Sequence, residues 1–197
     1  MNKELSLRLN EIYEFGVRHD STNKDHSEQM LNITPDTGLF LSILIQATKA
    51  RRVLEIGTSN GYSTMWIADA LENSDGAVIT VEVSSKKAEL AKKNFAMSGL
   101  SECIELHIID VQDFLESQDD DSFDIVFLDA ERSQYVSYWN HIRRVLKSGG
   151  LLLVDNALSP RPEELADFFK LVDDSEEFLS QILKIGKGEF LALKYQL

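Results

Sequence analysis

The chain of 197 residues has the length of one α/β domain, since domains commonly contain about 100 to 200 residues. Its hydrophobic (43%) and charged (27%) fractions are those of a globular protein with one large core, which excludes a disordered chain as the default. The formal net charge of −13 argues against non-specific nucleic-acid binding, because an acidic protein repels the phosphate backbone at long range.

Residues 1–50 are predicted to form two leading helices. In the first, apolar residues recur near helical spacing, which predicts an amphipathic helix from Asn2 to about His19. These apolar residues are Leu5, Leu9, Ile12 and Val17. A polar loop, DSTNKDHSEQ, follows. Pro35 stands where a second helix can begin, with LFLSILIQATKA buried along one broad face.

From residue 51 the sequence alternates between short apolar runs and longer segments of helical period. The predicted strands are RRVLEIG, AVITVE, CIELHIID, FDIVFLD and GGLLLVD. The predicted helices between them are YSTMWIADALE, SKKAELAKKNFAMSG, VQDFLESQ and SQYVSYWNHIRRVLKSG. Such βαβ units predict a doubly wound, Rossmann-like α/β fold, with helices on both faces of a sheet whose first five strands are parallel.

The C-terminal part is predicted to hold a helix and a hairpin. After Pro160 and Pro162 the segment EELADFFKLV has a helical pattern. The last two apolar runs, FLSQILKI and EFLALKYQL, are separated by GKG, a turn suited to an antiparallel pair.

The sequence shows neither a membrane-spanning run nor a signal peptide. No apolar run reaches the ~18 residues that cross a bilayer, and MNKELSLRLNEIYEF lacks the charged-then-apolar order of a secretion signal. We therefore expect a cytoplasmic protein without a membrane partner. Cys103 is the single cysteine and cannot form an intramolecular disulfide; its place in CIELHII predicts a buried strand thiol.

An acidic residue lies in or at the end of each of the five predicted strands. These residues are Glu55, Glu82, Asp110, Asp129 and Asp155. Ligands of open parallel sheets bind outside the carboxyl ends of the strands, so we expect these side chains to gather at one edge. Because like charges in a partly desolvated cleft are costly, the set indicates a ligand rich in hydroxyls and amines together with a metal ion.

A glycine turn, Glu55-Ile-Gly-Thr-Ser-Asn-Gly-Tyr-Ser63, joins the first of these strands to its helix. Gly57 and Gly61 allow the backbone to bend sharply near a ligand, although a tight turn without a ligand is the alternative interpretation. Glu82 follows Gly61 by 21 residues (82 − 61), a place from which an acid can accept hydrogen bonds from ribose hydroxyls.

A nicotinamide dinucleotide is one candidate for this ligand. The dinucleotide motif has a glycine where this chain has Ser59, and a third glycine where it has Thr64 or Met65. Glu55 would also repel a pyrophosphate, so a ligand without pyrophosphate fits better.

Four segments carry a resemblance to a known family: VLEIGTSNGYSTMWIADAL, TVEVSSKKAELAKKN, DIVFLDAERSQYVSYW and GGLLLVDNAL. From about Met30 to the C-terminus the chain resembles the cation-dependent S-adenosylmethionine O-methyltransferases, the family of catechol and caffeoyl-CoA O-methyltransferases. The resemblance implies a single class I methyltransferase domain over 1–197, with leading helices at 1–50, a cofactor and metal core at 51–156 and a helix and hairpin at 157–197. It also implies a seven-stranded sheet with an antiparallel last strand, and a homodimer to which the leading helix contributes.

The resemblance assigns cofactor-binding residues one by one. Gly57, Ser59, Gly61 and Ser63 would hold the amino-acid end of S-adenosylmethionine, and Glu82 its ribose. Asp110 would lie near the adenine, while Asn32 and Ile33 would cover the cofactor near its methyl donor. Glu55 and Asp129 complete the implied set.

The family's metal ligands match Asp129, Asp155 and Asn156. Two carboxylates and an amide carbonyl are hard oxygen donors that suit Mg²⁺ first, and also Mn²⁺ or Ca²⁺. The alternative is that these residues only cap local structure. Methyl transfer is an in-line displacement, and a cation on the acceptor hydroxyl would activate and orient it. This chemistry favours a small catechol-like acceptor with two neighbouring oxygens.

The chain departs from the family in two places. Relatives commonly carry a lysine three positions after the first metal aspartate, where this chain has Arg132; a guanidinium cannot take the hydroxyl proton, although it could stabilise a phenolate or grip an acidic substrate. After Asn156 the chain has ALSPRPEEL in place of the family's aromatic, glycine-bearing loop, which leaves the acceptor open.

Three other functions stay open on the sequence alone. The chain could be a methyltransferase for a hydroxylated tRNA nucleoside, which its acidity disfavours. It could be a cofactor-binding module without catalysis, which the three metal ligands disfavour. A nicotinamide oxidoreductase is the most distant of the three.

Overall fold

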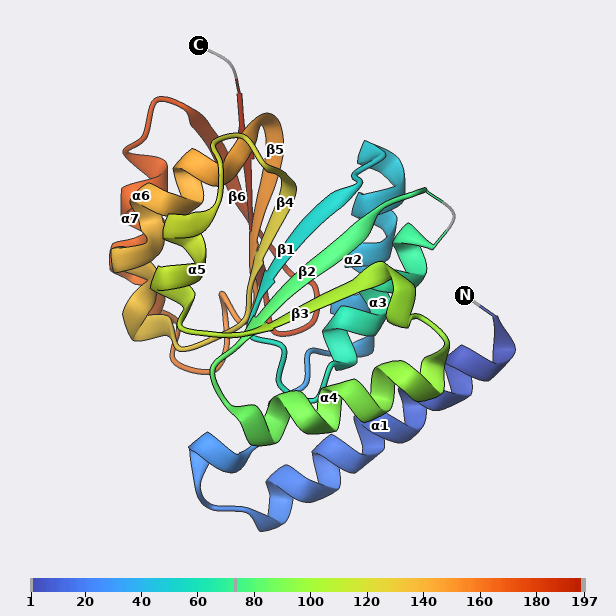
Figure 1. Cartoon of the computed structure of the whole chain (residues 1–197). Coiled ribbons are helices and arrows are strands. Elements are labelled where there is room, and N and C mark those ends of the chain that lie inside the picture. Colours follow the sequence, from blue (N-terminus) through green and yellow to red (C-terminus); the bar gives the residue numbers. More distant parts are fainter. Residues whose placement is uncertain (1, 73, 196–197) are drawn as a thin grey trace.

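A seven-stranded sheet of order β3-β2-β1-β4-β5-β7-β6 forms the centre of the computed structural model, which describes residues 2–72 and 74–195 (Figure 1). The strands are β1 (Arg52–Ile56), β2 (Ala77–Glu82), β3 (Ile104–Ile108), β4 (Phe123–Leu128), β5 (Leu146–Val154), β6 (Phe178–Leu183) and β7 (Glu189–Lys194). All neighbours among the first five pair in parallel, and β7 is antiparallel to both β5 and β6. The predicted fold is confirmed. Strand order reverses between β1 and β4, where doubly wound folds form their ligand crevice.

Helices cover both faces of the sheet (Figure 1). One face carries α1 (Lys3–Thr22), α2 (Pro35–Thr48), α3 (Tyr62–Leu71) and α4 (Ser85–Ser98); the other carries α5 (Val111–Ser117), α6 (Tyr135–Val145) and α7 (Ala166–Asp173). Short 3₁₀ turns lie at His26–Glu28, Ser101–Cys103, Arg132–Gln134 and Pro162–Leu165. Successive strand residues alternate between the two cores, because side chains of a strand point to opposite faces: in β1, Val53 packs under α1 to α4 and Leu54 under α5 to α7.

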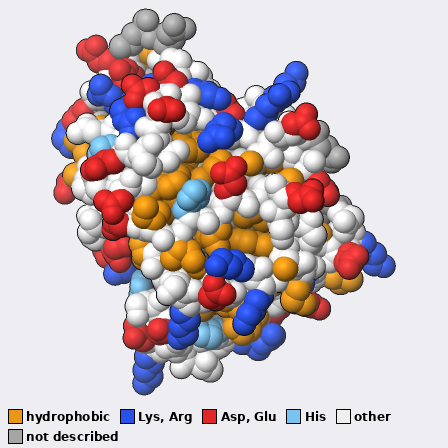
Figure 2. Space-filling view, viewed as in Figure 1, with side chains coloured by type: hydrophobic (Ala, Val, Ile, Leu, Met, Phe, Trp, Pro, Cys, Tyr) orange, Lys and Arg blue, Asp and Glu red, His pale blue; other side chains and the backbone are white. Residues whose placement is uncertain are grey.

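The prediction for Cys103 is wrong. Cys103 ends the 3₁₀ turn before β3 and is only half-buried. β3 is an edge strand with partly exposed side chains, so the apolar run around Cys103 is not a fully buried strand. Figure 2 shows apolar side chains gathered over this edge of the molecule, where Ile108 and Ile109 are exposed.

Some predicted boundaries also differ. The helix predicted through Gly149 ends at Val145, because β5 begins at Leu146. The pairing of β4 with β5 jumps from Phe123↔Leu146 to Ile125↔Leu151, so the segment with the two glycines is an irregularity in a strand and not a helix end. α1 continues past His19 to Thr22. Residues 196–197 of the last predicted run lie outside the described residues.

In the described part of the chain, none of the helices combines the length and the apolar character needed to cross a bilayer.

Candidate active site

The glycine turn connects β1 to α3 at the point where strand order reverses. Gly57 has a φ of +107°, and a Cβ at this position would lie 2.1 Å from the backbone oxygen of Asp129, so the turn packs directly on the end of β4. The Gly57 N–H donates to the carbonyl of Val81 at 3.0 Å, which fixes the turn to β2 as well. Ser59, at the tip of the turn, has a left-handed φ of 49°.

Glu82 ends β2 and faces this turn. Its Oε2 accepts a hydrogen bond from the Ser59 N–H and its Oε1 one from the Ser84 N–H, both at 2.8 Å. A carboxylate oxygen has two lone pairs, so each oxygen can accept one further bond. The backbone thus presents a carboxylate with fixed orientation and spare acceptor capacity.

Glu55 lies beneath the turn and is fully buried. Its Oε2 accepts hydrogen bonds from the hydroxyls of Thr64 (2.5 Å) and Thr80 (2.6 Å). Burial raises the pKa of Glu55 to about 7, in spite of these hydrogen bonds and one from Ser63. The structure therefore places Glu55 as a support below the site, and its direct contact with a cofactor stays a prediction.

The segment Met30–Ile33 closes over the turn from the other side. The Ser59 hydroxyl donates to the Met30 carbonyl at 2.7 Å. The carboxylate of Asp20, in α1, accepts from the N–H groups of Met30 (2.7 Å) and Leu31 (2.8 Å) and so anchors the segment. Through these bonds the leading helix positions the segment that carries Asn32 and Ile33.

A small hollow remains between this segment and the glycine turn. It is lined by Met30, Leu31, Asn32, Ile33, Gly57, Thr58, Ser59, Asn60, Tyr62, Ser63 and Asp129. Its volume of about 10 Å³ holds roughly one water molecule, so a larger ligand requires the segment to move outward.

Six of the predicted residues line this hollow, and five lining residues were not predicted. The predicted ones are Asn32, Ile33, Gly57, Ser59, Ser63 and Asp129. The others are Met30, Leu31, Thr58, Asn60 and Tyr62. These five residues line the hollow because the segment Met30–Ile33 lies close to the glycine turn, and residue type alone does not indicate that contact. Two predicted residues near the turn do not line the hollow: Gly61, the N-cap of α3, and Glu82, which is hydrogen-bonded to Ser59.

Asp110 and Glu82 stand at the ends of neighbouring strands, since Glu82 pairs with Ile108. Asp110 is exposed and caps α5, accepting from the N–H groups of Gln112 (2.8 Å) and Asp113 (3.4 Å) through one oxygen. Val83 and Ile109, next to the two acids, are 66% and 40% exposed. This rim combines two carboxylates with two uncovered apolar side chains.

Asp129, Asp155 and Asn156 meet at the ends of β4 and β5. The Asn156 amide nitrogen donates to Oδ1 of Asp129 at 3.4 Å and to Oδ2 of Asp155. The Asn156 Oδ1 is buried and has no hydrogen-bond partner among the described residues. Loss of hydration raises the pKa of Asp129 well above its usual range, and the charge of Asp155 raises it further.

This arrangement fits a hard divalent cation. Two desolvated carboxylates need a positive partner, and an unpaired buried amide oxygen is an oxygen donor of the kind that Mg²⁺, Mn²⁺ and Ca²⁺ take. Within residues 2–72 and 74–195, no cluster of three or more His, Cys, Asp or Glu side chains is arranged to bind a metal ion. A cation here would therefore depend on the Asn156 oxygen and on water in addition to the two aspartates.

Arg132 points at the loop that follows Asn156. Its guanidinium donates to the carbonyls of Pro160 (2.6 Å) and Arg161 (3.3 Å) and lies 3.5 Å from Glu164. The side chain is only 14% exposed. The structure thus gives Arg132 a loop-holding function; its predicted contact with the acceptor stays a prediction.

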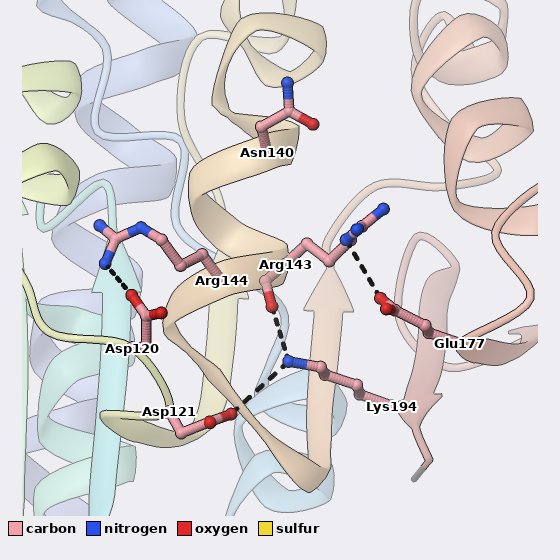
Figure 3. Close-up of a pocket in the computed structure, with 7 residues that line it drawn as sticks. All are labelled: Asp120, Asp121, Asn140, Arg143, Arg144, Glu177 and Lys194. Atoms are coloured by element: carbon pink, nitrogen blue, oxygen red, sulfur yellow. Dashed lines mark hydrogen bonds and ion pairs between the residues drawn. The ribbon is translucent and has the colours of Figure 1, made fainter. Parts of the chain in front are cut away.

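A larger hollow of about 400 Å³ lies at the opposite edge of the sheet, and its charges are already paired (Figure 3). It is lined by Asp120, Asp121, Asn140, Arg143, Arg144, Glu177 and Lys194. The ion pairs are Arg144–Asp120 (2.7 Å), Arg143–Glu177 (3.1 Å) and Lys194–Asp121 (3.6 Å). The two arginine bridges tie α6 to the segments before β4 and β6, and the Lys194 bridge ties β7 to the segment before β4. Each cation that lines the hollow is therefore already paired, which leaves none of them for an anionic ligand.

Comparison with known proteins identifies the family of the chain. A family model described as O-methyltransferase matches residues 4–161. The chain belongs to this O-methyltransferase family. The matched range contains every predicted site residue from Asn32 to Asn156, whereas β6 and β7 lie beyond it.

Curated proteins similar to this chain are also named as O-methyltransferases. A catechol O-methyltransferase from Niastella koreensis is 34% identical over 131 residues, which cover 65% of this chain and 59% of the relative. One from Mycobacterium tuberculosis is 36% identical over 126 residues, covering 64% and 57%. A caffeoyl-CoA O-methyltransferase 1 from Zea mays is 31% identical over 138 residues, covering 68% and 53%. The matches thus span less than two thirds of these relatives' lengths.

Solved structures of O-methyltransferases match this chain over almost its full length. An O-methyltransferase from Bacillus cereus, in complex with SAH, has a TM-score of 0.79 at 27% identity and covers 95% of this chain and 90% of its own. The O-methyltransferase TomG from Streptomyces achromogenes, in complex with SAM, has a TM-score of 0.77 at 25% identity, covering 100% and 91%.

Proposed function

We propose that this chain is an S-adenosylmethionine-dependent O-methyltransferase that uses a divalent cation to present a hydroxyl of a small acceptor. The observation that carries the proposal is the buried, unpartnered oxygen of Asn156, whose amide nitrogen bridges two desolvated aspartates at the same sheet edge as the glycine turn and Glu82. One edge thus offers acceptors for a nucleoside and hard donors for a cation.

The cofactor part of the proposal follows from the rim around Glu82. The spare lone pairs of Glu82 suit two ribose hydroxyls, and Val83 and Ile109 offer apolar faces to an adenine ring. Asp110, with one oxygen used by the α5 cap, has a second oxygen that can accept from an adenine amine. The bound SAH and SAM of the Bacillus and Streptomyces structures support this choice of ligand.

The metal part of the proposal assigns Asp129, Asp155 and Asn156 as protein ligands. When bound, a divalent cation lowers the pKa of an acceptor hydroxyl and orients it. The Asn156 amide nitrogen donates to both carboxylates, and the amide would turn its oxygen toward a bound cation. A guanidinium offers only donors and no acceptor, so Arg132 does not serve as the base and instead holds the loop at Pro160 beside the site.

The acceptor is proposed to be a small molecule with two neighbouring oxygens, since such a pair can chelate a cation. The names of the curated relatives, catechol and caffeoyl-CoA O-methyltransferase, support this substrate class. The segment Met30–Ile33, anchored by Asp20, is placed to exclude water once it closes on the cofactor.

We further propose a homodimer. The leading helices expose large apolar side chains, Leu7 and Phe15 on α1 and Leu39 and Ile43 on α2, which a second copy could cover. Light scattering coupled to size exclusion tests this directly: a mass of twice 22.3 kDa is expected, and a monomer at micromolar concentration contradicts it.

The activity is tested by methyl transfer from labelled S-adenosylmethionine to catechols, flavonoids and hydroxycinnamoyl thioesters, each with Mg²⁺ and with a chelator. We expect transfer to at least one vicinal diol, lost on chelation and restored by added Mg²⁺. Transfer that is indifferent to the chelator contradicts the metal part alone. Binding of S-adenosylhomocysteine without turnover on any acceptor favours a non-catalytic module.

A further inference from the structure

Glu189, the first residue of β7, is a fully buried acid at the same sheet edge as the two aspartates. Because β7 is antiparallel, it begins where the parallel strands end. In the pairing of β5 with β7, Val154 lies opposite Phe190, so one further step sets Asp155 opposite Glu189. Side chains at opposite positions of antiparallel neighbours lie on one face within contact distance. The register itself therefore brings Glu189 to the proposed metal ligand.

The Glu189 carboxyl lies between Thr37 and Asp155. Its Oε1 accepts a hydrogen bond from the Thr37 hydroxyl at 2.8 Å. By register its carboxyl lies beside that of Asp155. The Oε2 of Glu189 and the Oδ1 of Asp155 are both buried and have no hydrogen-bond partner among the described residues. Glu189 thus bridges a proposed metal ligand and helix α2.

Backbone packing fixes the Thr37 side of this bridge. Thr37 lies in the first turn of α2, which Thr34 caps, and the two hydroxyls are 3.1 Å apart. Gly186, in the turn between β6 and β7, has a φ of +55°, and a Cβ there would lie 2.4 Å from the Thr37 hydroxyl. The turn that leads to Glu189 is therefore fitted closely against the start of α2, directly after Asn32 and Ile33.

We propose that Glu189 is a positioning residue that holds Asp155 in the orientation needed to bind a cation. Through Thr37, Glu189 also couples Asp155 to α2, the helix that follows the segment Met30–Ile33. The inference rests on the proposed function. Glu189 lies beyond residues 4–161, the range matched by the family model, so the family match assigns it no role.

The test compares Glu189→Gln, Glu189→Leu and Thr37→Val in the full chain, with Mn²⁺ binding measured by calorimetry in the absence of acceptor. Glutamine can accept from Thr37 and can donate an N–H to the Asp155 carboxylate, whereas leucine fills similar space and can do neither. We expect Glu189→Gln to stay within about 3-fold of the wild-type affinity and Glu189→Leu to bind about 10- to 100-fold more weakly, the usual effect of outer-shell partners. Thr37→Val is expected to cause a smaller loss.

Binding of S-adenosylhomocysteine and the melting temperature serve as controls for folding, because the cofactor contacts at Gly57 and Glu82 are unchanged. Wild-type Mn²⁺ affinity in Glu189→Leu overturns the proposal. An equal loss in the glutamine and leucine variants also overturns it, because Glu189 would then act as a charged ligand. If Glu189→Leu does not fold, full affinity in Thr37→Val together with a loss in Glu189→Gln overturns it. A wild-type chain that binds no Mn²⁺ overturns the metal half of the proposed function as well.

Discussion

The backbone N–H of Ser59, in the turn after β1, donates a 2.8 Å hydrogen bond to the carboxylate of Glu82 at the end of the neighbouring β2. This bond joins the tip of the glycine turn to the end of the neighbouring strand. It explains why a left-handed serine is stable at the tip: hydrogen bonds to charged acceptors contribute about 1.5–3 kcal/mol, comparable with the cost of such a conformation. The turn and the proposed ribose acceptor are therefore one structural unit.

Glu82→Ala is expected to abolish tight cofactor binding. The variant loses the hydrogen bonds proposed for the ribose and leaves the Ser59 N–H without its acceptor. We expect the free energy of cofactor binding to weaken by about 3 kcal/mol, which corresponds to about 100-fold in affinity. Calorimetric titration with S-adenosylhomocysteine measures this. Glu105→Ala, which removes an exposed acid on β3, is the matched control and should bind normally. Equal affinities in the two variants would refute the assignment of Glu82.

Asp155→Ala is expected to remove metal-dependent methyl transfer while largely sparing cofactor binding. Loss of a direct ligand should exceed the ~10- to 100-fold cost of outer-shell changes. Turnover at saturating Mg²⁺ and titration with S-adenosylhomocysteine separate the two effects. Asp167→Ala, an exposed acid on α7, should behave like the wild type. Retained turnover in Asp155→Ala would contradict the metal site.

The ends of the strands could be predicted from the sequence because their apolar runs have distinct limits. Glu82, Asp129 and Asp155 each follow such a run, so their common edge needs only the parallel topology. Glu189 shares that edge and could have been placed there, since the GKG turn already indicated an antiparallel last strand. Its contact with Asp155 depends on register, for which the sequence offers no direct signal.

Contacts between loops could not be predicted. Asp20 holds Met30 and Leu31 through backbone N–H groups, and residue type does not reveal such bonds. Arg132 shows the same limit, because its residue type gives no sign that the guanidinium binds carbonyls of a loop almost thirty residues away.

Arg132→Lys is expected to raise KM for the acceptor several-fold with little change in kcat. One nitrogen of the guanidinium, Nη1, makes the contacts to Pro160, Arg161 and Glu164. The shorter lysine carries a strongly hydrated ammonium that does not extend to the position of Nη1, so the loop beside the site loosens. Steady-state kinetics at saturating cofactor measure the split. Arg18→Lys, an exposed exchange on α1, is the control. A clear rise in kcat would show instead that this position normally houses a base.

Glu55→Gln is expected to change how stability depends on pH. Burial raises the pKa of Glu55 from 4.5 to about 7, so the folded state binds this proton more tightly than the unfolded chain. Its contribution to stability is complete below pH 4.5 and is lost as the pH rises through 7. Relative to wild type, the free energy of unfolding of Glu55→Gln should therefore rise by about 3 kcal/mol between pH 4 and pH 8, since each unit of pKa shift corresponds to about 1.4 kcal/mol. Urea unfolding of the cofactor-free chain at several pH values measures this difference. Glu105→Gln, an exposed change, is the control. A flat difference for Glu55→Gln would mean that the pKa of Glu55 is the same in the folded and unfolded chain.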